Sequence, residues 1–144
     1  MTQIDKSPEN TPVLDAGAAV LFCLLAVAQA DGPVRASELD LIARLVDMPK
    51  TGDMAALGVY RELLGAQDGL ESGLVLVGAA LDAARGAQAY ALAADFVMLN
   101  ARIAPEEMRM LDILAENFRL NPLTRAAIDT AAQIRLAPEL GHYD

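Results

Sequence analysis

One stretch of the sequence, residues 16–30, is apolar almost without interruption and restricts the folds open to this chain. It reads AGAAVLFCLLAVAQA and contains no charged residue. In a soluble chain, a helix that is apolar nearly all round belongs at the centre of a bundle, where neighbouring helices cover each of its faces. We therefore predict a central helix over residues 14–29.

The same stretch also resembles the apolar region of a secretory signal that ends in a small-x-small cleavage site. A signal needs a positively charged start, whereas here Lys6 is outnumbered by Asp5, Glu9 and Asp15. The stretch is also too short to cross a bilayer. We expect a soluble, cytoplasmic protein with no integral membrane segment.

The rest of the chain has the apolar periodicity of amphipathic helices, punctuated by Pro, Gly and Asn. No stretch alternates as a strand would. Counted from the helix over 14–29, the fourth helix should end near Arg85 and Gly86. Pro105 should be the first residue of the sixth helix, whose Met108, Leu111 and Leu114 should face inward. Further helices are predicted over 36–47, 53–65, 87–99 and from an Asn121 N-cap with Pro122 in the first turn.

These elements predict an all-α fold, a compact bundle of about seven helices. The 144 residues are enough for one core, so one domain is expected over 13–137. Residues 1–12 are a predicted flexible leader, and residues 138–144 a predicted flexible tail.

Charge and composition exclude several classes of function. The formal net charge is −9 and the sequence pI is about 4.4, so nucleic acid and anionic membranes would be repelled. Cys23 is the only cysteine and His142 the only histidine, so an intrachain disulfide, a zinc cluster and a Ser-His-Asp triad are unavailable. Cys23 should be a small buried hydrophobe.

Two segments of the sequence repeat each other. Residues 30–42 (ADGPVRASELDLI) align with residues 99–111 (LNARIAPEEMRML), so that Asp31 falls on Asn100 and Glu38 on Glu107, a separation of 69 positions in both cases (100 − 31 and 107 − 38). Each copy joins a very apolar helix to an amphipathic one that starts with an acidic residue. We therefore expect an internal pseudo-repeat.

With this repeat, the chain resembles the TerB-like family associated with tellurite resistance, over roughly residues 12–136. The family hallmark is Ala-Asp-Gly, a short turn and a Glu that opens the next helix, present twice. The first copy is intact, whereas the second has Asn100 where the family usually has Asp and Ala101 where Gly is frequent. The resemblance implies a bundle of about seven helices, a cytoplasmic setting, a link to tellurium oxyanion or general stress, and an acidic end with metal-binding potential. It implies no known reaction.

The candidate site consists of oxygen-bearing side chains from the two copies. Carboxylates and amides are the ligands that Ca²⁺ or Mg²⁺ takes, and pseudo-symmetric packing of the halves would bring them to one end of the bundle. A simpler interpretation is that Asp31 bonds its own turn and that each glutamate caps its helix. The candidate metal ligands are Asp31, Glu38, Asn100, Glu106 and Glu107.

Two polar residues in the apolar helix over 87–99 also need an explanation. Asp95 is expected to be exposed, or else buried and paired with Arg125 or Arg135. Tyr90 is interpreted as a core-edge residue whose hydroxyl is in water.

Three functions are compatible with the sequence. The favoured one is a non-enzymatic module that binds a divalent cation or docks a protein partner of a stress-resistance pathway through its acidic end; no other cofactor is indicated. The second is a helical scaffold for protein–protein interaction that takes no small ligand. The third is an oxyanion-handling enzyme or carrier, for which Cys23 is the only thiol able to act as reductant.

Overall fold

The computed structural model describes residues 16–46, 62, 64–66, 68–100 and 104–136. Within this part the chain forms helices and no strand, which confirms the all-α prediction. The predicted leader and tail lie outside the described residues, as does most of the third helix, of which residues 62, 64 and 65 are helical. The helices are α2 (Ala16–Ala28), α3 (Ala36–Val46), α5 (Gly69–Ala80), α6 (Ala83–Leu99), α7 (Pro105–Asn117) and α8 (Pro122–Leu136).

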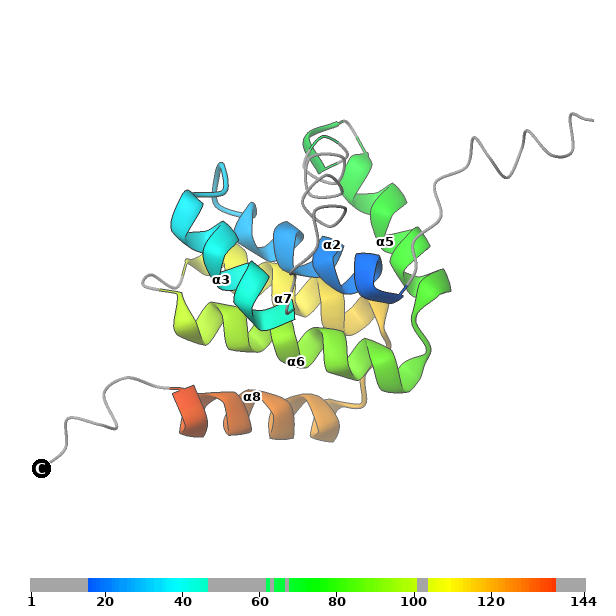
Figure 1. Cartoon of the computed structure of the whole chain (residues 1–144). Coiled ribbons are helices and arrows are strands. Elements are labelled where there is room, and N and C mark those ends of the chain that lie inside the picture. Colours follow the sequence, from blue (N-terminus) through cyan, green and yellow to red (C-terminus); the bar gives the residue numbers. More distant parts are fainter. Residues whose placement is uncertain (1–15, 47–61, 63, 67, 101–103, 137–144) are drawn as a thin grey trace, which may run out of the picture.

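Helix α2 is the centre of the molecule, as its uniform hydropathy predicted. It contacts α3, α5, α6 and α7, which surround it in Figure 1. Eight consecutive residues, from Leu21 to Ala28, are buried. Such a helix would be unstable alone, because its stability depends on the apolar area that its neighbours remove from water.

The contact of α2 with α5 depends on a glycine. A Cβ atom added at Gly73 would lie 2.0 Å from Cζ of Phe22, and the Phe22 side chain has no exposed surface. The ring therefore packs directly on the α5 backbone, and only glycine leaves room for it.

The boundary between α5 and α6 differs from the prediction. Helix α5 ends at Ala80, and α6 begins at Ala83 rather than near residue 87. Asp82 is the N-cap of α6, and its side chain accepts a hydrogen bond from the backbone N–H of Arg85 at 2.9 Å. Gly86 lies inside α6 instead of ending a helix, and a Cβ there would lie 2.9 Å from the Phe118 ring. Glycine is therefore needed at position 86 for the packing of Phe118 and does not end a helix there.

Helices α7 and α8 begin where Pro105 and Asn121 predicted. Pro105 is the first residue of α7, and Asn121 caps α8 by accepting a hydrogen bond from the Leu123 N–H at 2.8 Å. The predicted inward face of α7 was wrong at one position, because Met108 is 46% exposed whereas Met110 is buried with Leu111 and Leu114. Glu107, the residue before it, is buried instead, and adjacent residues of a helix point in different directions.

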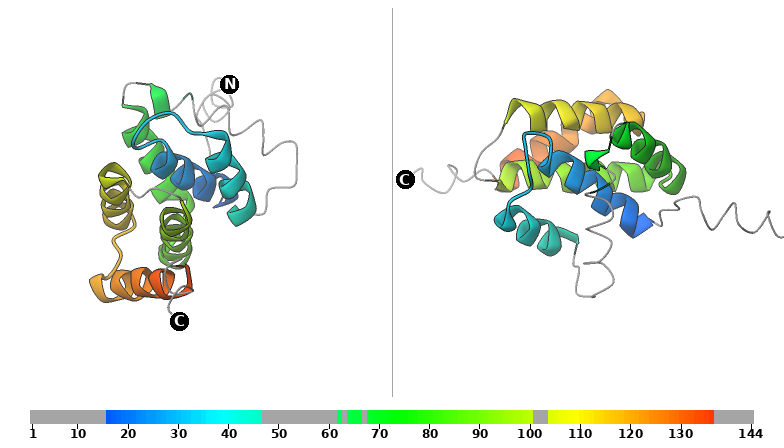
Figure 2. Two further views of the ribbon diagram at one scale, coloured as in Figure 1. Left: turned by 90° about the vertical axis from the view of Figure 1, so that its left-hand side faces the viewer. Right: turned by 90° about the horizontal axis from the view of Figure 1, so that it is seen from above.

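Helix α8 lies at the edge of the bundle. Figure 1 and the left view of Figure 2 show α6 between α8 and α2, and α8 packs chiefly against α6. Of its residues only Ala132 is buried. None of the helices described has the length and hydropathy needed to cross a membrane.

Candidate functional site

Helices α3 and α7 begin in the same way, each with a glutamate at its third residue. Glu38 Oε1 accepts a hydrogen bond from the backbone N–H of Arg35 at 2.9 Å, and Glu107 Oε1 accepts one from the N–H of Ala104 at 3.4 Å. Each carboxylate thus reaches back to the residue before its own helix, which is the glutamate half of a capping box. The capping interpretation is correct for both glutamates.

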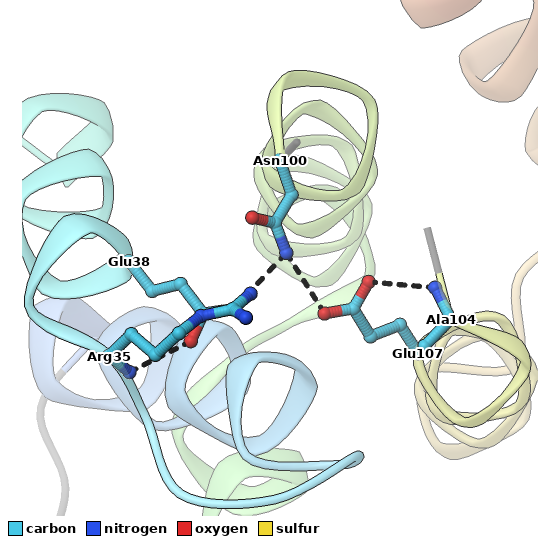
Figure 3. Close-up of polar contacts among 5 residues, drawn as sticks. All are labelled: Arg35, Glu38, Asn100, Ala104 and Glu107. Atoms are coloured by element: carbon cyan, nitrogen blue, oxygen red, sulfur yellow. Dashed lines mark hydrogen bonds and ion pairs between the residues drawn. The ribbon is translucent and has the colours of Figure 1, made fainter. Parts of the chain in front are cut away.

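These two glutamates are the buried charged residues of the described structure, and they lie close together. Glu38 is 2% exposed and Glu107 is 0% exposed. Asn100, which follows α6, lies between them (Figure 3): its Nδ2 donates to Glu38 Oε2 at 3.1 Å and to Glu107 Oε2 at 3.0 Å. One amide group therefore joins the starts of α3 and α7 to the end of α6. We call Glu38, Asn100 and Glu107 the carboxylate–amide cluster.

Positive charge reaches this cluster from one side. The guanidinium of Arg35 lies 3.2 Å from Glu38 Oε2, and the arginine is half exposed. Glu107 has no ion pair with a described residue. Burial raises the pKa of Glu107, hydrogen bonds from Ala104 and Asn100 oppose this, and the negative charges of Asp31 and Glu38 raise it further. Among the described residues, Arg35 is thus the one cation that pairs with the two carboxylates of the cluster.

The structure brings together three of the five predicted ligands. Asp31 is exposed but close enough for its charge to act on Glu107. Glu106 is also exposed, one position from Glu107 on a helix, where neighbouring residues point in different directions. Among the residues the structure describes, no three His, Cys, Asp or Glu side chains are placed to hold a metal ion together. An ion at the cluster would need the Asn100 amide oxygen, backbone oxygens or water as further ligands.

Sequence reasoning missed two residues at this end of the bundle. Arg35 pairs with Glu38 three positions along the chain, a spacing typical of the first turn of a helix. Gln29 lies two residues before Asp31, and its Oε1 is buried with no hydrogen-bond partner among the described residues. An unsatisfied buried amide oxygen is uncommon. No sequence pattern marked it, because a glutamine next to an apolar run is ordinarily solvated.

The single thiol is unsuited to redox chemistry. Cys23 has no exposed surface, and burial raises its pKa to about 12, so the thiol is neutral at physiological pH. The thiolate is the reactive form, and reactive cysteines are at least partly exposed. The prediction of Cys23 as a buried hydrophobe is confirmed, and the oxyanion-reducing alternative loses the group on which it depended.

Comparison with known proteins found no match: no protein-family model, no curated protein and no solved structure is similar to this chain at a significant level.

Proposed function

We propose that this chain is a non-enzymatic, TerB-like module that acts in tellurite or general stress resistance by binding a divalent cation at the carboxylate–amide cluster. The family assignment depends on the sequence resemblance, namely the order and spacing of the Ala-Asp-Gly turn and the two helix-opening glutamates. The equivalent capping contacts of Glu38 and Glu107 support the internal pseudo-repeat on which that resemblance depends.

One observation carries the proposal: two buried carboxylates from different helices converge on a single atom, Asn100 Nδ2, and the negative charge of Asp31 acts on one of them, Glu107. Without an ion, an amide N–H₂ group has two N–H donors and can therefore serve both carboxylates at once. If the amide of Asn100 rotates by half a turn, its oxygen takes the place of the nitrogen, and three oxygens then surround one point. Glu38, Glu107 and Asn100 would hold the ion, and exposed Asp31 would attract it.

Thermal unfolding after removal of bound metal with EDTA tests this proposal. A ligand that binds only the folded state at a hundred times its dissociation constant stabilises by roughly 2.7 kcal/mol, so Ca²⁺ or Mg²⁺ should raise Tm. The doubly substituted Glu38→Gln/Glu107→Gln protein keeps polar side chains at both helix starts and should lose the increase.

The matched control is Glu71→Gln, because Glu71 is an exposed glutamate in the first turn of α5. This variant removes a helix-start charge away from the cluster and should respond to the ion like the wild type. Equal Tm values with the divalent salt and with NaCl of the same ionic strength would show that the carboxylates are caps and nothing more.

A second candidate function is a helical scaffold that docks a protein partner without a small ligand. The observation in its favour is the outer face of α8, where Leu123 is 81% exposed and Ile134 is 64% exposed. Exposed apolar side chains on one helix are common at protein interfaces. In this case Leu123→Ser and Ile134→Ser would abolish partner capture, and a divalent cation would not change the Tm of the wild type.

A further inference from the structure

Helix α8 is attached to the bundle differently from the other helices. Helix α2 buries nine side chains, whereas the fifteen residues of α8 bury only Ala132, with Ile128 partly buried against the core. Because hydrophobic stabilisation follows the apolar area removed from water, little of it holds α8 in place.

Polar side-chain contacts also attach α8 to α6 and α7. The Tyr90 hydroxyl, on α6, donates to Asp129 Oδ1 at 2.8 Å and accepts from Arg125 Nε at 2.9 Å. Arg125 also bonds Asp112 on α7 and lies 3.6 Å from Asp129. We call Tyr90, Asp112, Arg125 and Asp129 the Arg125 cluster. These contacts correct the sequence interpretation of Tyr90, whose side chain is fully buried and whose hydroxyl bonds protein groups.

A second ion pair lies near the other end of α8. Arg135 donates to Asp95 Oδ1 at 3.1 Å, which settles the predicted alternatives for Asp95 in favour of pairing with Arg135. Asp112 and Arg135 are both more than half exposed. Exposed ion pairs contribute little and weaken as salt increases.

Opening of α8 would leave few polar groups unsatisfied. The Tyr90 hydroxyl and the carboxylates of Asp112 and Asp129 exchange protein partners for water. The surface uncovered on α6 and α7 is apolar and includes Ala94, Val97 and Leu111, which line a small crevice beneath Ala132. The cost of opening is therefore the apolar contact of α8 over Ala94, Val97 and Leu111, together with a set of partly solvated polar contacts.

We infer that α8 is a strap that opens from α6 and α7 as a unit while the rest of the bundle stays folded, with the Arg125 cluster as the latch that holds it closed. Structural units that bury few apolar contacts open at lower free energy than the core, and amide hydrogen exchange measures that opening segment by segment.

Native-state hydrogen exchange of the full chain tests the strap in two ways. In the wild type, amides of α8 should exchange at least about tenfold faster than those of α2. Addition of NaCl should accelerate exchange in α8, because salt screens the ion pairs that hold the strap. Exchange in α2 should not accelerate, because salt also screens the repulsion among the acidic residues of a chain with net charge −9 and so stabilises the folded bundle.

Substitution tests the latch. Arg125→Gln should raise exchange in α8 by about a further tenfold and leave α2 within about twofold, since a hydrogen bond to a charged group has been lost. Arg44→Gln, which removes an exposed arginine from α3, should change the exchange rate of neither α8 nor α2.

Equal exchange in α8 and α2 of the wild type, or a salt effect of the same sign on both helices, would overturn the strap. An Arg125→Gln protein with wild-type exchange in α8 would overturn the latch. If Arg125→Gln does not fold, the wild-type salt series decides the proposal alone.

Discussion

At the scale of single residues, the stability of this protein should report the protonation of Glu107. Burial and neighbouring negative charge raise its pKa above the ordinary glutamate value of 4.5. Between the raised pKa and 4.5, the folded protein holds a proton that the unfolded chain has released. The free energy of unfolding therefore rises as the pH falls through this window, and the gain is lost again as the pH rises.

We predict that the wild type gains stability relative to Glu107→Gln as the pH is lowered from neutral towards 4.5. At pH 7 the two proteins should differ by less than about 1.5 kcal/mol, because the substitution loses one good acceptor but also removes a buried charge. Urea unfolding at a series of pH values measures both quantities. Glu71→Gln should show the same dependence of unfolding free energy on pH as the wild type. The same dependence in Glu107→Gln would contradict the raised pKa of Glu107.

The second prediction at this scale concerns Cys23. Its thiol is buried with a pKa of about 12, so iodoacetamide should not modify the native protein, although it should modify the chain in urea. Cys23→Ala should cost on the order of 1 kcal/mol of stability, because it removes one buried atom, and should leave any tellurite phenotype intact. Mass spectrometry and a growth assay check these outcomes. Loss of resistance in a folded Cys23→Ala variant would restore the redox hypothesis.

At the scale of helices, two glycines of α5 should respond oppositely to the same substitution. A Cβ at Gly73 meets the buried Phe22 ring at 2.0 Å, whereas a Cβ at Gly78 has Asn117 as its nearest neighbour, at 3.9 Å. Gly73→Ala should therefore destabilise by about 1–3 kcal/mol through overpacking. Gly78→Ala should stabilise by roughly 0.5–1 kcal/mol, because alanine loses less backbone entropy in a helix.

Thermal or urea unfolding of the two single variants measures this difference, and each variant is the control for the other. Propensity alone predicts that both substitutions stabilise. Stabilisation at both positions would mean that Phe22 moves aside easily and that the close contact of α2 with α5 is not needed.

At the scale of the whole molecule, the excess of acidic residues should make stability depend on salt. The net charge is −9, so the acidic side chains repel one another when folding brings them close together. Salt ions screen this repulsion. We predict that Tm rises as NaCl is added to a low-salt buffer, by roughly 3–5 °C for each kcal/mol gained in a domain of this length. A Tm that falls with NaCl would show that the ion pairs of α8 outweigh the general repulsion.

Some of this architecture follows from the sequence because it depends on local chemistry. The uniform apolarity of residues 16–30 requires a covered helix, and Pro105 and Asn121 mark helix starts by fixing φ or capping backbone N–H groups. The two glutamates were recognised for the same reason, since a capping contact spans three residues.

The rest was decided by tertiary packing. Gly86 was predicted to end a helix, but Phe118, thirty-two positions away (118 − 86), packs against it and Asp82 starts α6 earlier. Similarly, no local pattern shows that Asn100 bonds two glutamates at once, or that Tyr90 and Asp95 find partners on α8. A sequence records which groups can donate, accept or cap, whereas the distance between groups far apart in the chain is fixed only when the helices pack.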